Sequence, residues 1–485
     1  MLPISDLDPK SAAPLYRQVY QQIRELISNG RLKNGFRLPA TRELAGQLGL
    51  NRTTISAAYE LLEHDGLIAG HVGRGSFVAA PPRQGGLNWN QLLDCKEIAT
   101  TPSAATISFS ASRPSELLFP IPEFRACCEE VIAGPDVQTI LQLGSPAGYG
   151  PLRRYLLEQA RAEGAARDSD DILITSGCQQ AFDLLQRILA ANGETVVVED
   201  PVYPGARNAF QRARARVMGV PVGPEGIDLA ALEHLLNSEH PRLLIVTATF
   251  QNPTGTTMPQ AARERLLSLA SRAGTVVIEN DIYGPLAYEG GTPATLKQLD
   301  PSGDTVLLRS FSKLAFPGLR VGWVIGPRPL IQKLTEAKQW SDLHSDQLSQ
   351  AVLLRFAESG RLETHRQHVL QTGGERLQAT LDACRLYLPP GTEWTHPRGG
   401  MNLWVRLPQP LDAGELLPRA ERAGVSYLPG KYFAVGTADP NALRLSFAGL
   451  TPEEIETGIR TLGRIFTTEL ERVRAASPLE ATALV

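Results

Sequence analysis

The chain of 485 residues is poor in the features that mark secreted, metal-bound or membrane proteins. It has five cysteines, an odd number, with neither a CxxC pair nor the spacing of a zinc site, so no disulfide framework or structural metal is indicated. No apolar run reaches the length of a membrane span. The first residues, MLPISDLDPK, lack a basic start and an apolar core, so we expect no signal peptide and a cytoplasmic location.

The chain also lacks internal repeats, low-complexity tracts and a strong overall charge. Its net charge of −3 gives no general attraction to nucleic acid or to an anionic membrane. The length exceeds that of one ordinary core, so at least two folding units are expected. One local surplus of positive charge stands out, because the stretch from Lys10 to Ala80 contains nine Lys and Arg residues but only five Asp and Glu residues. That surplus is compatible with contacts to a nucleic-acid backbone.

The N-terminal segment has the pattern of short helices followed by a β-hairpin. Apolar residues recur at helical spacing from Pro14 to Asn29. A second helix is predicted to have Thr41 as its N-cap and to end at Gly49, and a third to run from Arg52 to His64. Two apolar runs around residues 73–75 predict the hairpin. A short turn between the last two helices is typical of a helix-turn-helix, for which the hairpin would be the wing.

In such a unit the third helix enters the major groove of DNA, so its first residues should offer donors to bases and phosphates. Arg52, Thr53 and Thr54 occupy these positions. Arg42, at the start of the second helix, and Arg74, at the hairpin tip, are placed for phosphate or minor-groove contacts. The alternative is a winged helix that serves for protein contacts.

Three stretches carry a resemblance across residues 12–80, namely PLYRQVYQQI, LPATRELAGQLGLNRTTISAAYELLEHDGLI and GRGSFV. Their order and spacing resemble the GntR winged-helix family, which implies double-stranded promoter DNA as a partner. Asn34 stands where that family more often has Pro, and Ala40 and Asn51 stand where it more often has Ser. These differences can change the preferred DNA sequence without threatening the fold.

Beyond residue 80 the chain changes character. Helical periodicity disappears over residues 81–105 while Pro, Gly, Asn, Thr and Ser accumulate, which predicts a linker with a root-mean-square span of roughly 28 Å. Strands then alternate with amphipathic helices, and the clearest strands are Ile172–Thr175, Thr195–Val198, Leu243–Thr247 and Thr275–Ile278. Because these strands are apolar without alternation, we expect a sheet buried on both faces and hence an α/β domain.

A lysine between hydroxyl residues and an arginine is the strongest chemical motif. Ser310-Phe311-Ser312-Lys313 is followed, seven residues after the lysine, by Arg320 at the end of a Pro-Gly turn. A lysine that holds an aldehyde cofactor as a Schiff base needs nearby hydroxyls and a cation for the cofactor's phosphate. Ser310, Ser312 and Arg320 fit these roles, and Lys313 is the Schiff-base candidate. Taken alone, such a lysine would more often be a solvated surface group.

Two further motifs offer partners for an aromatic cofactor ring. Asp281 follows a predicted strand, where its carboxylate can pair with a pyridine nitrogen and keep it protonated. Tyr283, and Asn252 in the sequence QNPTG, can donate hydrogen bonds to a phenolic oxygen of the ring. The alternatives are that Asp281 caps a helix and that QNPTG is an ordinary turn.

A turn between a predicted strand and the helix expected over Ala181–Leu189 suits a phosphate. There Gly177 and Cys178 can offer exposed backbone N–H groups at a helix start. Tyr203, in EDPVY, can stack on the cofactor ring. The alternatives are an ordinary turn and a buried core tyrosine.

These motifs, in this order, resemble the class I and II aminotransferases of fold type I over about residues 105–470. The resemblance implies pyridoxal 5'-phosphate as cofactor, with Lys313 as the aldimine lysine, Asp281 as the partner of the pyridinium and Tyr203 as the stacking residue. It implies that Asn252 and Tyr283 bind the phenolate. It further implies that Arg444, in LRLSF, takes a substrate α-carboxylate with a bidentate fork, the alternative being a structural salt bridge.

Some positions differ from that family's usual pattern. Leu143, Ser112 and Asn402 stand where relatives more often have Tyr, Gly and His, and Cys178 replaces a hydroxyl residue. These differences bear on substrate identity and catalytic efficiency rather than on cofactor binding.

Together, a reader at residues 12–80, a linker at 81–105 and an aminotransferase-like domain at 106–470 resemble the MocR-type regulators, the GabR-like subfamily. The resemblance implies a head-to-tail homodimer in which a small amino-compound effector reacts with the Lys313 internal aldimine and changes promoter binding, with weak or no turnover. Two alternatives stay open. One is a catalytically active aminotransferase with a vestigial or autoregulatory reader, and the other is a cofactor-free scaffold that binds DNA constitutively.

Overall fold

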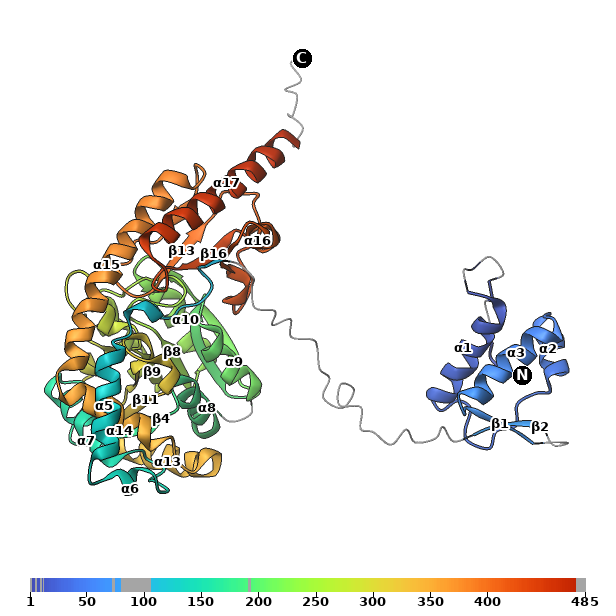
Figure 1. Cartoon of the computed structure of the whole chain (residues 1–485), viewed down its shortest axis with the longest axis horizontal. Coiled ribbons are helices and arrows are strands. Elements are labelled where there is room, and N and C mark those ends of the chain that lie inside the picture. Colours follow the sequence, from blue (N-terminus) through green and yellow to red (C-terminus); the bar gives the residue numbers. More distant parts are fainter. Residues whose placement is uncertain are drawn as a thin grey trace, which may run out of the picture. The chain divides into compact units, whose positions relative to one another are not determined.

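The computed structural model describes residues 2–4, 7–8, 11, 13–71, 75–79, 106–190 and 193–476. The chain separates into two compact units, residues 1–101 and 102–485, each with its own core (Figure 1). The linker predicted at 81–105 and Arg74 at the hairpin tip lie outside the described residues.

The first unit contains the predicted helices and hairpin. Its elements are α1 (Leu15–Ser28), α2 (Thr41–Leu48), α3 (Arg52–His64), β1 (Ile68–His71) and β2 (Gly75–Val78). Gly30 and Gly49, which follow α1 and α2, have φ of 73° and 68°, the left-handed backbone that ends a helix and favours glycine. The prediction of Thr41 as the N-cap is wrong, because Thr41 is the first residue of α2 and follows Ala40, which has no capping side chain.

Asn51 caps the helix that would read DNA. Its side chain accepts a hydrogen bond from the Thr53 N–H at 3.2 Å, which satisfies one of the free donors at the start of α3.

The hairpin is also broader than predicted, because residues 36–38 run beside β2. The Leu38 N–H donates to the Ser76 carbonyl and the Val78 N–H to the Phe36 carbonyl, both at 2.9 Å.

A mixed sheet forms the centre of the second unit. Its eight strands lie in the order β4-β11-β10-β9-β8-β5-β6-β7. Their bounds are β4 (Asp170–Thr175), β5 (Thr195–Asp200), β6 (Arg216–Gly223), β7 (Gly226–Ile227), β8 (Leu243–Val246), β9 (Val276–Asn280), β10 (Val306–Ser310) and β11 (Gly322–Pro327). The strands from β10 to β6 pair in parallel, whereas β11 and β7 pair antiparallel to their neighbours.

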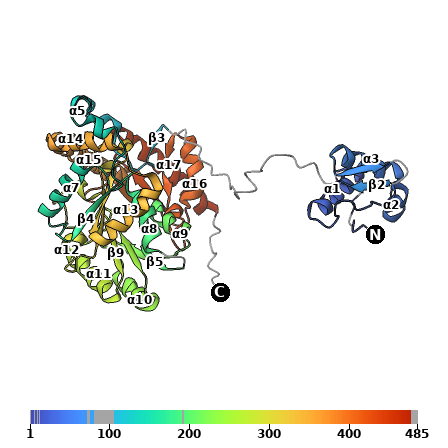
Figure 2. The ribbon, with the colours of Figure 1, turned by 90° about the horizontal axis from the view of Figure 1, so that it is seen from below.

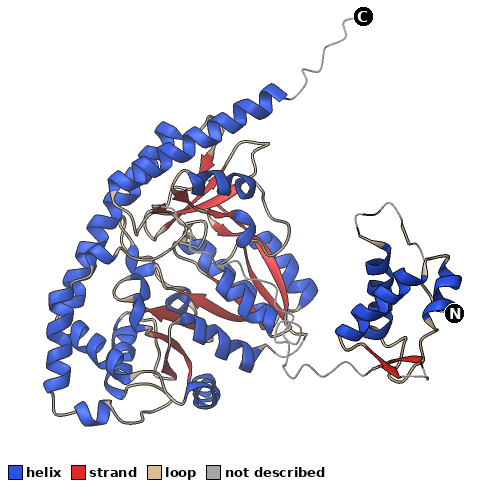
Figure 3. Cartoon of the chain, turned by 45° about the vertical axis from the view of Figure 1, so that its right-hand side comes forward, coloured by secondary structure: helices blue, strands red, loops and turns tan. Residues whose placement is uncertain are grey.

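Both faces of this sheet are buried, as its apolar strands predict. Along β8, Leu243 and Ile245 belong to one hydrophobic core, whereas Leu244 and Val246 belong to another. Successive side chains of a strand point to opposite faces, so apolar residues at every position require a covered sheet on each side. Helices supply that cover on both sides (Figure 3).

The covering helices have bounds α5 (Ile121–Ala133), α6 (Val137–Ile140), α7 (Gly150–Ala162), α8 (Cys178–Leu189), α9 (Pro204–Arg212), α10 (Leu229–Glu239), α11 (Gln260–Ala273), α12 (Leu296–Leu299), α13 (Arg328–Asp342) and α14 (Gln347–Glu358). The helix predicted over 181–189 begins earlier, at Cys178. No helix in the described part of the chain is long and apolar enough to cross a membrane.

A smaller lobe packs beside the central sheet and has a core of its own. It contains α15 (Arg361–Tyr387), α16 (Ala413–Arg422) and α17 (Pro452–Ala476), and α15 and α17 lie side by side (Figure 1). Its sheet has the order β12-β13-β16-β15. The strand bounds in this lobe are β3 (Ile107–Ser108), β12 (Glu393–Trp394), β13 (Asn402–Arg406), β14 (Val425–Ser426), β15 (Leu428–Pro429) and β16 (Ala442–Ser446).

Candidate functional site

The predicted site residues of the second unit follow the carboxyl ends of neighbouring strands. Tyr203 comes after β5, Asn252 after β8, Asp281 after β9, and Lys313 after β10. Because parallel strands end at one edge of a sheet, these residues meet there. They surround a cavity of about 420 Å³. Its lining includes Ser112, Cys178, Tyr203, Asn252, Asn280, Tyr283, Ser310, Ser312, Lys313, Arg320, Phe433 and Arg444.

Lys313 ends a short 3₁₀ turn that follows β10. Its Nζ donates a hydrogen bond to the Ser112 carbonyl at 2.5 Å and lies 5.6 Å from the centre of the Tyr283 ring. The side chain thus reaches across the cavity from the large sheet to the segment that opens the second unit. A primary amine in a partly enclosed cavity is what Schiff-base chemistry requires.

One corner of the cavity gathers groups that suit a phosphate. The Ser310 hydroxyl donates to the Ser312 hydroxyl at 2.9 Å or to the Val321 carbonyl at 3.0 Å, and it accepts from the Ser312 N–H at 3.1 Å. Arg320 is exposed, and among the described residues its guanidinium donates to the carbonyls of Ser176 and Pro317, each at 3.3 Å. Two hydroxyls and a cation are therefore adjacent and not neutralised by a carboxylate among the described residues.

The helix start in this corner differs from its prediction in one respect. Cys178 is the first residue of α8, where an N–H has no acceptor within the helix. The Gly177 N–H, in contrast, donates to the Thr175 carbonyl at 2.8 Å. Gly177 has φ of 80°, and a Cβ there would stand 2.4 Å from Nη2 of Arg320. Glycine at this position therefore leaves room for the arginine rather than offering a donor. Burial raises the pKa of the Cys178 thiol to about 12, so that side chain is uncharged.

A buried carboxylate lies behind the cavity. Asp281 is 3% exposed, and its Oδ2 accepts from Nε of Arg309 at 2.9 Å. Arg309 also pairs with Glu163 at 2.7 Å. Burial raises the pKa of Asp281, and Arg309 opposes that rise. A cation held beside a buried carboxylate favours its charged form, which is the form that would pair with a protonated ring nitrogen.

Asn252 and Tyr283 both line the cavity and contact each other. Nδ2 of Asn252 donates to the Tyr283 hydroxyl at 3.2 Å, and Oγ of Ser112 lies 3.2 Å from the same hydroxyl. Burial raises the pKa of Tyr283, but Lys313 and the Ser112 hydrogen bond outweigh it, so the pKa lies below its ordinary value. Tyr203, at the N-cap of α9, lines the cavity and is 36% exposed, which leaves its ring accessible for stacking.

Arg444, on β16, brings a buried cation to the cavity. Nη1 donates to Oδ1 of Asn252 at 3.0 Å, Nη2 donates to the Ser110 carbonyl, and the guanidinium lies 5.0 Å from the centre of the Phe433 ring. Among the described residues no carboxylate pairs with it, and Nε has no partner, so a structural salt bridge does not account for it. Burial lowers its pKa to about 10, opposed by Tyr283 and Tyr203, which leaves it charged at neutral pH.

One buried side chain that supports the site, Gln251, was not predicted from the sequence. Gln251 donates to the Pro201 carbonyl at 2.8 Å and to Glu199 at 3.3 Å, while its Oε1 accepts from the Thr254 N–H at 2.9 Å. It thereby joins the turn that carries Tyr203 to the turn that carries Asn252. Its position directly before the NPTG turn was the available signal.

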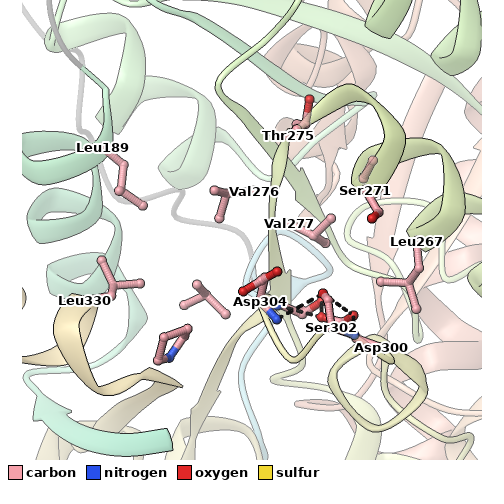
Figure 4. A pocket seen from close by; sticks show the side chains of 15 residues that line it. Leu189, Leu267, Ser271, Thr275, Val276, Val277, Asp300, Ser302, Asp304 and Leu330 are labelled. Atoms are coloured by element: carbon pink, nitrogen blue, oxygen red, sulfur yellow. Dashed lines mark hydrogen bonds between the residues drawn. The ribbon is translucent and has the colours of Figure 1, made fainter. Parts of the chain in front are cut away.

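Two other hollows in the described part of the second unit contain none of the predicted residues. One of about 320 Å³ lies at the opposite ends of β9 and β10, where Val276, Val306 and Leu189 line it (Figure 4). Part of its polar lining is paired internally, since Asp300 accepts from the N–H groups of Ser302 and Thr305. A groove of about 860 Å³ lies elsewhere, between residues 200–201, 221–224, 254–257 and the small lobe.

The predicted DNA contacts lie at the start of the second and third helices of the first unit. Arg42, Arg52 and Thr53 are exposed, and Thr54 is partly buried. The Asn51 cap places Arg52 and Thr53 in the first turn of α3, where the helix dipole favours an anion such as a phosphate. Arg74 cannot be placed, since it lies outside the described residues.

Comparison with known proteins agrees with both units. The family described as aminotransferase class I and II matches residues 126–462, and the gntR family of bacterial regulatory proteins matches residues 15–78. The structure of LysN, the alpha-aminoadipate aminotransferase from Thermus thermophilus, superimposes with a TM-score of 0.73. It is 34% identical in sequence, over 80% of this chain and 100% of that chain.

Relatives also match across both units at once. The uncharacterized HTH-type transcriptional regulator YdfD of Bacillus subtilis is 32% identical over 93% of this chain and 96% of its own length. The probable rhizopine catabolism regulatory protein MocR of Rhizobium meliloti is 27% identical over 95% of each chain. The chain therefore belongs to the class I and II aminotransferase family and, with its gntR-family helix-turn-helix, is a MocR-like HTH regulator.

Proposed function

We propose that this protein is a pyridoxal-phosphate-dependent transcription regulator whose DNA binding changes when a small amino compound reacts at Lys313. The observation that carries the proposal is that the primary amine of Lys313 and the guanidinium of Arg444 line one cavity. The same chain has a gntR-family helix-turn-helix unit. The amine suits the cofactor's aldehyde, and the guanidinium suits the carboxylate of an amino acid.

The residues present fit the cofactor. Ser310, Ser312, Arg320 and the N-terminus of α8 would hold its phosphate, and Asp281 would pair with its ring nitrogen. Asn252 and Tyr283 would bind the phenolic oxygen, and Tyr203 would stack on the ring. When bound, the cofactor supplies an aldehyde carbon that can exchange one amine for another.

The fit is supported by a relative of known structure. LysN was solved in complex with N-(5'-phosphopyridoxyl)-L-leucine, so a cavity of the same fold accommodates a cofactor joined to an amino acid. In this chain the corresponding ligand would place its carboxylate at Arg444, which has no carboxylate partner among the described residues. Such an effector can shift DNA binding only by its different affinity for two conformations of the protein.

The experiment that tests the proposal uses the full-length protein loaded with pyridoxal phosphate and a DNA fragment that the protein itself selects from random sequences. Each common L-amino acid is added in turn while the cofactor's absorbance and the DNA affinity are recorded. We expect at least one amino acid to change both. In Lys313→Ala the DNA should still bind, but amino acids should no longer change its affinity. A response that persists in Lys313→Ala would refute the proposal.

The DNA side has its own comparison. Arg52→Ala removes a donor at the start of α3 and should weaken DNA binding without changing the cofactor's spectrum, since the two groups belong to separate units. Arg17→Ala, which removes an exposed arginine of α1, is the matched control. Equal weakening in both variants would point to general electrostatic attraction rather than to groove reading.

A second function, transamination, is favoured by the completeness of the cavity. Apart from Gly177, every group predicted for cofactor and carboxylate binding lines the cavity or, in the case of Asp281, lies behind it. We expect weak or no turnover in a regulator, and the measurement is conversion of amino and keto acids by the loaded protein relative to free cofactor. The predicted head-to-tail homodimer is part of the same proposal, and its measurement is the mass of the loaded protein in solution.

A further inference from the structure

The segment that follows the predicted linker passes along the cavity. Residues 106–112, which we call the junction segment, are the first described residues after the linker at 81–105. They begin with β3, which pairs in parallel with β14 beside α17 (Figure 2). The main chain then continues through Ser110 to Ser112 at the wall of the cavity. Any change in how this segment is held is therefore adjacent, along the chain, to the linker and the reader.

Two cations hold the junction segment by its main chain. Arg444 Nη2 donates to the Ser110 carbonyl, and Lys313 Nζ donates to the Ser112 carbonyl at 2.5 Å. The Ser112 hydroxyl also lies 3.2 Å from that of Tyr283. The two cations are those to which the proposed function assigns the effector's carboxylate and the cofactor's aldehyde. Both ligands therefore compete with the junction segment for the same donors.

The two bonds respond to an effector in opposite directions. Were Lys313 joined to the cofactor's carbon, its nitrogen would have at most one hydrogen in place of the two or three of a free amine, which would weaken its hold on Ser112. An effector amine that replaced it would form the carbon–nitrogen double bond to the aldehyde carbon as the double bond to Nζ broke. The effector's nitrogen would pass two protons to Nζ, or one where the double-bonded nitrogen is protonated both before and after the exchange. No oxidation occurs, and Lys313 is again a primary amine that can donate. The effector's carboxylate meanwhile competes for the Arg444 guanidinium that held Ser110.

We propose that the junction segment is a two-position latch that reports effector binding to the linker. It rests on the proposed function. In the loaded protein without effector, Arg444 holds the segment at Ser110. When the effector is bound, Lys313 holds it at Ser112, two residues further from the linker, and more of the segment is released toward the reader.

The rest of the segment is held by main-chain bonds and by Phe109, whose side chain is fully buried in the core of the small lobe. The Phe109 carbonyl accepts from the Ser446 N–H at 2.9 Å. The Ile107 N–H donates to the Gly424 carbonyl at 3.0 Å and the Phe109 N–H to the Ser426 carbonyl at 2.8 Å. These amides exchange with solvent only when the segment opens. A hydrogen bond from a charged donor contributes enough that its loss should make local opening roughly tenfold more frequent.

Hydrogen–deuterium exchange of peptides that cover residues 106–112 of the full-length protein tests the latch. Addition of pyridoxal phosphate should speed exchange of the Ile107 and Phe109 amides roughly tenfold, because it withdraws Lys313 from Ser112. In Lys313→Met exchange should be fast without cofactor and should not change when cofactor is added. Lys333→Met, which removes an exposed lysine paired with Glu336, should behave as the parent protein.

The contact of Arg444 with the Ser110 carbonyl is tested in the protein loaded with pyridoxal phosphate. Arg444→Met should speed exchange of the same amides by a further factor of roughly ten, and Arg444→Lys, which keeps one charged donor, should speed it less. The second variant keeps the test usable if the first does not fold. Exchange at the parent's rate in Lys313→Met and Arg444→Lys alike would overturn the latch.

The link to the reader is tested by fixing the segment in place. Ser108 and Ser426 are partners in the β3–β14 pairing and their hydroxyls lie 3.0 Å apart, so cysteines at both positions are close enough for a disulfide. With this pair reduced, Arg444→Lys should change the affinity of the loaded protein for its selected DNA, and with the pair oxidised it should not. If Arg444→Lys changed the DNA affinity equally with the cysteine pair reduced and oxidised, the proposal that the junction segment signals to the reader would be overturned.

Failure of the latch and failure of the proposed function give different results. If pyridoxal phosphate does not become attached to Lys313, the proposed function is refuted and the latch loses its trigger. If it does become attached but the junction amides do not respond, only the latch is refuted.

Discussion

Replacement of Gly177 by alanine is the sharpest single test of the phosphate corner. The residue has φ of 80° and ψ of 171°, a region that is nearly restricted to glycine and costs other residues about 1–3 kcal/mol. The added Cβ would stand 2.4 Å from Nη2 and 3.1 Å from Cζ of Arg320. The arginine must therefore move out of the corner or the turn must change shape. Either adjustment weakens the group that we assign to the cofactor's phosphate.

The expected loss follows from one charged hydrogen bond. Such a bond contributes about 1.5–3 kcal/mol, so Gly177→Ala should bind pyridoxal phosphate roughly 10- to 100-fold more weakly. The measurement is an absorbance titration of the cofactor-free protein. Gly318→Ala is the matched control. Gly318 lies in the Pro-Gly-Leu-Arg motif that contains Arg320, and a Cβ at Gly318 meets nothing within 4 Å. Equal affinity of Gly177→Ala and the parent would refute the placement of the phosphate.

Three further predictions concern other parts of the chain. Burial raises the pKa of Glu199 from 4.5 to about 8, so the folded chain holds a proton that the unfolded chain releases between these values. The free energy of unfolding should therefore fall as pH rises through that window, and Glu199→Gln should flatten the fall in urea titrations at several pH values. Asn51→Ala removes the cap of α3 and should lower the stability of the isolated 1–79 unit by about 1 kcal/mol, measured by urea unfolding, whereas Thr41→Ala should not. Arg309→Met removes the cation beside Asp281 and should raise the carboxyl's pKa, seen as a shift in the pH dependence of the cofactor's absorbance.

The elements of the fold were predictable from local pattern. Helical spacing in the first unit and unbroken apolar strands in the second each depend on residues close in sequence. Capping was less predictable. Thr41 begins one helix and Asn51 precedes another, and whether such a residue is the N-cap depends on its backbone conformation, which the sequence does not give. Asn51 has the extended conformation of an N-cap, whereas Thr41 already has helical geometry.

The site was predictable where a motif follows the end of a strand. Asp281, Asn252 and Lys313 lie where their motifs indicated, because the carboxyl ends of parallel strands meet. The contacts between motifs were not predictable, since they join distant parts of the chain. Ser112 and Tyr283, for example, are 171 residues apart. Gly177 was also misjudged as a donor, because its turn directs the N–H back to the Thr175 carbonyl.

The central claim is that one lysine holds the cofactor by a bond that an amine can exchange. Borohydride reduction of the loaded full-length protein, followed by proteolysis and mass spectrometry, tests this most directly. We predict a pyridoxyl group on the peptide that contains Lys313, and its loss when a responsive amino acid is added before the reduction. A pyridoxyl group on another lysine, or none at all, would contradict the account.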